Sequence, residues 1–521
     1  MKKRLIVPAL AALLCVSTVV GCTTDKGGYT PVDQGGIDLY PYSTVRDTQG
    51  VYMGDVMPFY DNGVMNIYHL QDKIGSLYMF YHPISRLTTT DYLHYKDEGI
   101  ALNFEEDLKS PDAALGTGSF IKDKSGKYHC FYTGHGASRE DVAPDPLEVV
   151  RHATSTDQKT WTKDEGFKLK GNCEGDKAYL NDDFRDPYVY YDNSDNLYYM
   201  LVTARENNEE TGYVEKGVIK YYASASLDAA ADGWEYKGIF FQNDAGTFNM
   251  ECPSYIELNG YYYLAYSEQG SERVTRYRYK TSKEDKKWYK FERDSIDGAG
   301  FYAGRLEKAG DKLYAFAWCA RLTKGDYGEF DWGGNLVAHE IVRQENGELT
   351  AVMVSAVKDA LKTKANYNTA SGGTADKISF AEDKFAATGF EKLSGNATRM
   401  SFKIKLGSTK GDFGLTFGID GAYNNRLGTS LIAFEPEKGR IACYNNVANI
   451  LRYGSLLTTL DFTFEKDKEY GVEVLYQNNL CTVYLDGKVA FTVRMPKTAE
   501  CGFAFYSNGT KVDVGDIAFY E

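Results

Sequence analysis

The stretch MECPSYIELNGYYYLAY, residues 250–266, decides the fold predicted for this chain. It consists of two short strand-like runs joined by Asn259-Gly260, a pattern that predicts a β-hairpin. Pro253 cannot donate a ladder hydrogen bond, so the first strand is expected at a sheet edge or near a strand end. Glu251 stands at the start of that strand. A lone glutamate in this place is ordinarily a solvent-exposed turn residue. A functional role for Glu251 is therefore inferred only if the same pattern recurs elsewhere in the chain.

The hairpin recurs in four other parts of the chain. The segments that follow the same plan are residues 58–70, 118–132, 187–200 and 301–316. The repeats are spaced about 50–70 residues apart without helical patterning between them, which predicts radial repetition with long outer loops. The sequence therefore predicts a five-bladed β-propeller.

Acidic residues occupy the same place in three of the five repeats. Asp55, Asp186 and Glu251 each stand at the start of the first strand of a repeat, and Thr117 and Phe301 mark that place in the other two. In a propeller, the first strand of each blade lines the centre of the ring. The three carboxylates are therefore expected to meet in one funnel.

The N-terminal residues predict export and lipidation. Residues 1–21 have the pattern of a signal peptide, with Lys2-Lys3-Arg4 ahead of an apolar run. Gly21 directly before Cys22 resembles a bacterial lipobox, which makes Cys22 the expected lipidated residue, and several acyl chains on one cysteine would anchor the protein stably. No other apolar run approaches the ~18 residues needed to span a bilayer. The expected location is the bacterial cell envelope, with the outer membrane as the expected anchor and the membrane face left open.

The composition excludes some partners and permits others. The formal net charge is −14, and without the three leader cations it is about −17, which argues against nucleic acid. A neutral substrate such as a carbohydrate is compatible with this charge, and the 42 tyrosines suit both strands and sugar-binding clefts. The cysteines that remain after the leader are odd in number and lack metal-ligand spacing. No metal ion and no cofactor is expected, and the oligomeric state is left open.

The rest of the chain predicts a second all-β domain. Residues 22–45 are a tether rich in Gly, Thr and Asp, and residues 46–345 form the propeller. Residues 346–374 are a connector with a short helix and a Gly-rich linker. Residues 375–521 return to short alternating strands, which predicts a β-sandwich of roughly jelly-roll type.

Two motifs surround candidate carboxylates, Asp183-Phe184-Arg185-Asp186-Pro187 and Met250-Glu251-Cys252-Pro253. They resemble the Arg-Asp-Pro and Glu-Cys motifs of glycoside hydrolase family 32, the fructan-cleaving enzymes. Further similar segments, in the family's order, are residues 116–119, 132–134, 297–303, 332–336 and 469–493. Each motif is short, but together they span most of the mature chain. The resemblance implies a five-bladed propeller followed by a β-sandwich, in agreement with the repeat count.

The resemblance implies a role for each candidate site residue. Retaining glycoside hydrolysis needs two carboxyl groups about 5–5.5 Å apart, one as nucleophile and one as acid/base. Asp55 is the implied nucleophile and Glu251 the implied acid/base, with Glu251 expected to hold its proton while Asp55 stays ionised. Asp186 would accept hydrogen bonds from sugar hydroxyls. Arg185 would orient Asp186, bind the substrate, or simply form an ion pair with a nearby acid.

Two aromatic residues and one altered motif complete the expected site. Tyr302 and Trp332 could stack on sugar rings, although either could equally belong to the core. The family usually carries Trp-Met-Asn-Asp-Pro-Asn-Gly around the nucleophile. Here residues 52–60 read YMGDVMPFY, so Gly54 replaces Asn while Asp55 is kept. This departure puts the identity of the sugar subsite in doubt.

Three functions remain open from the sequence. The first is a retaining hydrolase of β-fructosides such as levan, inulin or fructo-oligosaccharides. The second is a glycosidase of the related propeller families, of arabinofuranosidase or xylosidase type, against which the cysteine after Glu251 and the C-terminal sandwich both count. The third is a surface glycan-binding protein without catalysis, which the altered motif favours and the retention of all three carboxylates disfavours.

Overall fold

The computed structural model describes most of the chain, in segments. The described residues are 36–41, 50–73, 82–136, 146–171, 179–207, 214–242, 248–270, 273–322, 330–419, 427–445, 454–495 and 502–521. The predicted signal peptide, Cys22 and most of the tether lie outside them. Within the described segments, no helix is long and apolar enough to span a bilayer.

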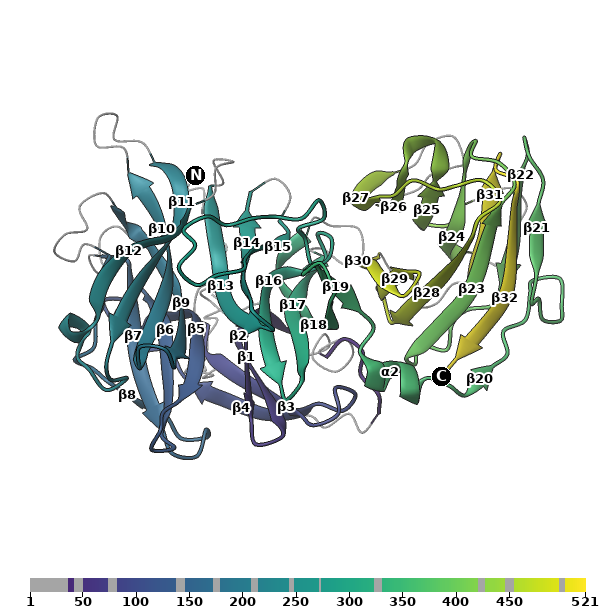
Figure 1. Cartoon of the computed structure of the whole chain (residues 1–521). Helices are drawn as coiled ribbons and strands as arrows, with labels where there is room; N and C mark the ends of the chain where they lie inside the picture. The colour runs from purple at the N-terminus through teal and green to yellow at the C-terminus, as the bar shows by residue number, and fades with distance from the viewer. Residues whose placement is uncertain are drawn as a thin grey trace, which may run out of the picture.

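The N-terminal part of the chain is a five-bladed β-propeller built from antiparallel sheets (Figure 1). The strands of the first two blades are β1 (Val51–Asp61), β2 (Val64–Lys73), β3 (Ile84–Thr89) and β4 (Lys96–Leu102), then β5 (Ala114–Lys122), β6 (Tyr128–His135), β7 (Glu148–Ser155) and β8 (Thr162–Lys163). The third blade contains β9 (Tyr179–Asp192), β10 (Leu197–Asn207), β11 (Val214–Ser224) and β12 (Glu235–Gln242). The last two contain β13 (Asn249–Leu258), β14 (Tyr261–Gln269) and β15 (Thr275–Lys280), then β16 (Tyr302–Ala309), β17 (Lys312–Leu322), β18 (Phe330–Arg343) and β19 (Leu349–Val352).

The first strand of each blade faces the centre of the ring, as predicted. β1 contacts β5 and β16, β9 contacts β5 and β13, and β13 contacts β16, so the five inner strands form a closed circle. The ring is also closed by pairing between β1 and β18, where Met53 lies opposite Gly334. The predicted Asn-Gly turns are present, because Asn62, Gly63, Asn259 and Gly260 all have the positive φ that such hairpin turns require.

A β-bulge interrupts every inner strand, in the first half of β1, β5, β13 and β16 and past the midpoint of β9. The residues within these register shifts are Gly54 and Asp55 on β1, Thr117 on β5, Asp186 and Pro187 on β9, Cys252 and Pro253 on β13, and Ala303 and Gly304 on β16. Asp186, Cys252 and Ala303 have φ values of 59°, 55° and 55°. An inner strand pairs with its blade on one edge only, so a bulge there costs few ladder bonds and turns a side chain toward the ring axis.

The C-terminal part is a β-sandwich, joined to the propeller by α2 (Ser355–Ala360) within the predicted connector. One sheet contains β20 (Lys364–Ala365), β21 (Ile378–Phe380), β23 (Thr398–Leu406), β28 (Glu469–Gln477), β29 (Leu480–Leu485), β30 (Lys488–Arg494) and β32 (Val512–Tyr520). The facing sheet contains β22 (Phe385–Phe390), β24 (Asp412–Ile419), β25 (Ser430–Glu435), β26 (Arg440–Asn445), β27 (Ser455–Asp461) and β31 (Gly502–Asn508). Their inner faces bury a core rich in phenylalanine.

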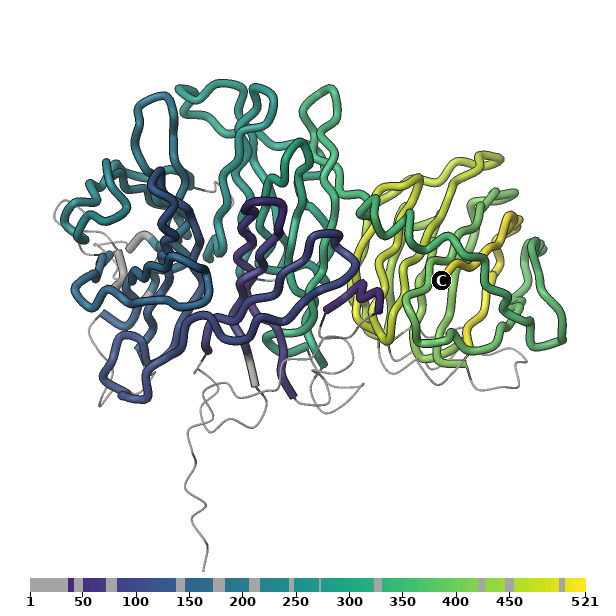
Figure 2. Tube along the Cα trace, turned by 90° about the horizontal axis from the view of Figure 1, so that it is seen from below, coloured from purple at the N-terminus to yellow at the C-terminus, as the bar shows by residue number. Residues whose placement is uncertain are grey.

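The two parts share a sheet and a buried charge, and Figure 2 shows them side by side. β19 pairs with β18 of the fifth blade and, through Val352, with Lys488 of β30, so the fifth blade extends past residue 345. At the junction, the buried carboxylate of Asp297 accepts hydrogen bonds from the Thr492 backbone N–H at 2.7 Å and from His339 Nε2 at 2.8 Å. Burial opposes ionisation of Asp297, but its hydrogen bond to His339 holds the pKa below the usual value. The sandwich therefore satisfies a charge that belongs to the propeller.

Candidate active site

The bulges of the inner strands bring the three predicted carboxylates to one level of the ring. Asp55 and Asp186 lie inside the bulges of β1 and β9, and Glu251 directly precedes the bulge of β13. The three are close enough that the charges of Glu251 and Asp55 both raise the pKa of Asp186. The structure thus places these residues together.

Both oxygens of the Asp55 carboxylate accept hydrogen bonds. Thr117 Oγ1 donates to Oδ2 at 2.6 Å, and Trp318 Nε1 donates to Oδ1 at 2.9 Å. Burial raises the pKa of Asp55 and the charge of Glu251 adds to this, while the two hydrogen bonds and the charge of Arg305 oppose it. Asp55 therefore needs these donors to stay ionised. The sequence predicted an ionised Asp55 but did not predict this dependence.

Glu251 is held by a cation on one oxygen and a hydroxyl on the other. Arg185 donates to Oε1 from Nη2 at 2.8 Å and from Nε at 3.2 Å, and the Tyr302 hydroxyl donates to Oε2. Burial and the charge of Glu251 raise the pKa of Tyr302 far above its usual value, so Tyr302 remains a donor. The Glu251 side chain is 15% exposed, which leaves it accessible to a ligand.

Asp186 is the most buried of the three acids, at 3% exposure. Its Oδ2 accepts a hydrogen bond from the Cys252 backbone N–H at 2.9 Å, and its own N–H donates to Thr133 Oγ1 at 2.9 Å. Burial raises the pKa of Asp186 to about 7, against the lowering effect of the Arg185 guanidinium. Near neutral pH, this carboxyl can therefore either accept or donate a hydrogen bond.

Arg185 pairs with nearby acids, one of the alternatives left open from the sequence, and through the pair with Glu251 it orients that carboxylate. Besides Glu251, its guanidinium donates to Asp183 Oδ1 at 2.8 Å, to Glu148 Oε2 at 3.3 Å and to Gln269 Oε1 at 3.4 Å. Asp183 in turn accepts a hydrogen bond from Arg205. A planar guanidinium surrounded by fixed acceptors has little freedom to rotate, so it fixes the position of the Glu251 carboxylate.

Aromatic rings form one wall beside Asp55. Trp318, the donor to Asp55, lies edge-on to Tyr302 at 5.5 Å between ring centroids and is tilted against Trp332 at 5.9 Å. Trp332 stacks on His82, with centroids 4.5 Å apart and ring planes 11° apart. Tyr302 thus acts on Glu251 through its hydroxyl, and Trp332 lies in this wall while remaining partly exposed.

Gly54 makes room for Trp332 directly next to Asp55. A Cβ atom built on Gly54 would overlap the six-membered ring of Trp332. The position that carries Asn in the family motif is therefore filled from another blade, because the indole of Trp332 occupies the space. The altered motif and the position of Trp332 are therefore linked, because the indole can lie here only if residue 54 has no side chain.

Four residues of the site were not singled out from the sequence as functional. They are Thr117 and Trp318, which hold Asp55, Glu148, which holds Arg185, and Arg305. The Arg305 side chain is 1% exposed, donates from Nη1 to the Gly118 carbonyl oxygen, and its charge lowers the pKa of Asp55. The Ala-Trp-Cys run in the fifth hairpin was the available signal for Trp318, but a lone tryptophan in a strand is more often core.

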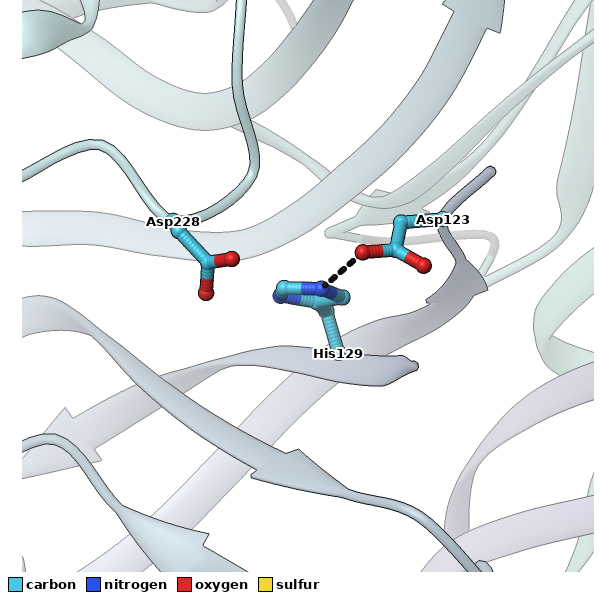
Figure 3. A group of neighbouring side chains, drawn as sticks. All are labelled: Asp123, His129 and Asp228. Atoms are coloured by element: carbon cyan, nitrogen blue, oxygen red, sulfur yellow. Dashed lines mark hydrogen bonds and ion pairs between the residues drawn. The ribbon is translucent and has the colours of Figure 1, made fainter. Parts of the chain in front are cut away.

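A separate group of possible metal ligands lies outside this site, at the turn between β5 and β6. His129 lies between Asp123 and Asp228 (Figure 3), with His129 Nε2 at 3.5 Å from Asp123 Oδ2. Asp123 also accepts hydrogen bonds from the Ser125 and Lys127 backbone N–H groups at 2.8 Å, and Lys127 Nζ lies 2.5 Å from Asp228 Oδ1. These acids are already engaged in a turn and an ion pair, so we assign no metal to them.

The comparisons with known proteins point in one direction. The family model described as "Glycosyl hydrolases family 32 N-terminal domain" matches residues 52–351. A levanbiose-producing levanase of Geobacillus stearothermophilus is 26% identical over 285 residues, which cover 52% of this chain and 60% of that protein. The levanbiose-producing levanase of Bacillus subtilis is also 26% identical, with 46% of its length covered. The chain thus spans about half the length of the curated relatives it matches.

Solved structures share the fold over nearly the whole chain. A β-fructofuranosidase of Bombyx mori matches with a TM-score of 0.64 and 16% identity, covering 94% of this chain and 93% of that one. Fructan 1-exohydrolase IIa of Cichorium intybus matches with a TM-score of 0.65 and 15% identity, covering 90% and 96%. These likenesses confirm the predicted architecture of a propeller followed by a sandwich.

Replacing Gly54 by alanine is expected to destabilise the protein by about 1–3 kcal/mol, because the added methyl group displaces Trp332. Urea denaturation monitored by tryptophan fluorescence measures the change. Gly270→Ala is the matched control, since a Cβ at that position meets no atom within 4 Å. Combining Gly54→Ala with Trp332→Ala should recover part of the loss. Equal stabilities for Gly54→Ala and the control would contradict the overlap.

Proposed function

Because this chain belongs to glycosyl hydrolase family 32, whose N-terminal domain model matches residues 52–351, we propose that it is a retaining hydrolase of β-fructosides such as levan, inulin or fructo-oligosaccharides. The observation that carries the proposal is the meeting of Asp55, Asp186 and Glu251 at one level of the ring, each held by its own donors. The two levanases among the relatives favour levan as the first substrate to test.

In the proposed first step, Asp55 attacks the anomeric carbon of the fructosyl unit. A bond forms between a carboxylate oxygen of Asp55 and that carbon while the glycosidic C–O bond breaks. Glu251 gives its proton to the departing oxygen, so the leaving group departs as an alcohol. Thr117 and Trp318 support this step because they fix the plane of the Asp55 carboxylate and balance its charge.

In the second step, Glu251 works as a base. It takes a proton from water, the water oxygen bonds to the anomeric carbon, and the bond to Asp55 breaks, which restores both carboxyl groups and retains configuration. Arg185 and Tyr302 support both steps, since they keep the Glu251 carboxyl in one place as its charge changes. Tyr302 stays protonated throughout because its pKa is far above the working range.

Asp186 is proposed to hold hydroxyl groups of the fructosyl ring. Its carboxyl has a pKa of about 7, so near neutral pH it can serve as acceptor or donor to a sugar hydroxyl. The Trp332 ring beside Gly54 is proposed to bound the same sugar subsite. A wall of indole in place of a polar asparagine side chain favours contact with the C–H face of a sugar over a hydrogen bond at that point.

Replacing Asp55 by asparagine is expected to lower turnover by about 10⁴-fold or more while sugar binding persists, because the amide cannot form the glycosyl ester. Product analysis on levan, inulin and sucrose measures release of fructose or fructo-oligosaccharides. Asp311→Asn, in the exposed turn between β16 and β17, is the control and should retain wild-type turnover. Release of pentose from arabinan or xylan by the wild type, without release of fructose, would overturn the fructoside assignment.

Replacing Arg305 by methionine is expected to shift the acid limb of the pH–activity profile to higher pH. The Arg305 charge lowers the pKa of Asp55, so its loss raises that pKa, and Asp55 becomes ionised only at higher pH. Arg305→Lys keeps the charge and should stay near the wild-type profile. The measurement is kcat/KM against pH, with thermal unfolding as a check of folding. Identical acid limbs in the methionine and wild-type proteins would refute this role.

We also propose that Cys22 carries a lipid that anchors the protein to the bacterial cell envelope. The proposal rests on the lipobox-like sequence before Cys22 and on the absence of another long apolar run in the sequence. Cys22→Ala is expected to prevent incorporation of labelled palmitate and to move the protein from the membrane fraction to the soluble fraction. Membrane retention and labelling that survive the substitution would show that the anchor lies elsewhere.

A further inference from the structure

A cavity of about 580 Å³ is lined by the third, fourth and fifth blades, and its lining includes none of Asp55, Asp186 and Glu251. Its lining residues are Tyr188, Tyr190, Tyr191, Asp192, Asn193, Ser194, Tyr255, Ile256, Glu257, Tyr262, Lys283, Glu307 and Lys308. We name it the tyrosine cavity, because five of these residues are tyrosines. Its volume lies within the range of about 300–1,000 Å³ that is typical of small-molecule sites.

The tyrosine cavity lies along the same inner strands that carry the candidate active site. Along β9 the lining runs from Tyr188, two residues after Asp186, to Asp192, and along β13 it runs from Tyr255, four residues after Glu251, to Glu257. These separations correspond to about 7–20 Å along a strand. None of the three carboxylates lines the cavity, which lies toward the C-terminal ends of the inner strands.

Partly exposed tyrosine rings give the cavity a sugar-compatible surface. Tyr190 contacts Tyr255 at 4.9 Å between ring centroids and stacks on Tyr199 of the next strand at 5.6 Å, with ring planes 19° apart. Tyr199 stacks in turn on Tyr221 at 6.3 Å. Within the fourth blade, Tyr262 stacks against Tyr255 with ring centroids 6.2 Å apart. Tyr199 and Tyr221 lie outside the lining of the cavity, and their rings continue the aromatic row from it across β10 and β11.

Polar groups stand among these rings with fixed positions. Lys283 binds Asp192 across the gap between the third and fourth blades and donates to Ser194 Oγ at 2.6 Å, so it fixes one rim of the cavity. Glu307 Oε1 accepts a hydrogen bond from the Tyr60 backbone N–H at 2.9 Å. Burial raises the pKa of Glu307 to about 8, so at neutral pH this carboxyl can donate a hydrogen bond as well as accept one.

We propose that the tyrosine cavity is a second, non-catalytic carbohydrate-binding site that takes a neutral oligosaccharide chain. Aromatic faces contact the C–H faces of sugar rings, and carboxyl and hydroxyl groups pair with sugar hydroxyls, as in pockets that combine ring surfaces with a few polar groups. The charged side chains of the lining, Asp192 and Glu257 against Lys283 and Lys308, balance in sign, which suits a neutral ligand. Because none of the three carboxylates lines the cavity, a bound chain stays tethered while the active site acts on another part of the polymer.

The inference goes beyond the proposed function and is tested separately from it. In affinity electrophoresis, the Asp55→Asn protein should be retarded by levan or inulin in the gel, and Tyr262→Ala and Tyr190→Ala introduced into it should weaken retention by about tenfold. Tyr262 lies outside the hydrophobic core clusters, so its replacement leaves core packing intact. Tyr289→Ala is the matched control, since Tyr289 is an exposed tyrosine that lies outside the cavity.

The expected pattern separates binding from turnover. In the otherwise wild-type protein, Tyr262→Ala and Tyr190→Ala should leave kcat/KM on sucrose unchanged and raise the apparent KM for the polymer. Retention by both cavity variants equal to that of the Tyr289→Ala protein would overturn the proposal, as would the lack of retention by levan, inulin, arabinan and xylan alike. Retention that the cavity variants weaken, without turnover of any sugar by the wild type, would support the second site and refute the proposed function.

Discussion

The whole site depends on a backbone constraint, the bulge within each inner strand. Among the described strands, four of the five inner strands pair on one edge only, and β1 adds a single bridge to β18 at Met53, so each can take an extra residue without breaking a central ladder. Asp186, Cys252 and Ala303 adopt positive φ at these bulges, a conformation that non-glycine residues rarely accept. Five blades with the bulge at one level convert separate segments of sequence into one ring of inward-facing groups.

The charges gathered by these bulges are balanced locally. Arg185 pairs with Glu148, Asp183 and Glu251, while Asp55 relies on uncharged donors and on the more distant Arg305. The two acids proposed to react thus have different environments. Glu251 has a cation and a hydroxyl, and Asp55 has a hydroxyl and an indole N–H.

Much of the fold could be predicted from local patterns. The Asn-Gly turns, the aromatic second strands and the recurrence of the hairpin suffice for five blades, because each blade is a local unit. The carboxylates were found because they recur at equivalent places in the repeat. The partners of Arg185 and the approach of Trp332 to Gly54 were not predictable, since they join residues from different blades and depend on side-chain packing. The tyrosine cavity was hidden for the same reason, because it joins only five of the 42 tyrosines of the chain.

The hydrogen bond from the Thr492 backbone N–H to Asp297 makes the propeller and the sandwich depend on each other structurally. A propeller separated from its sandwich would expose β19 as a bare strand edge and leave Asp297 without a donor from β30. Selection then acts on the two parts jointly, so neither can be exchanged freely between chains as a module. The fifth blade is therefore tied to this particular sandwich.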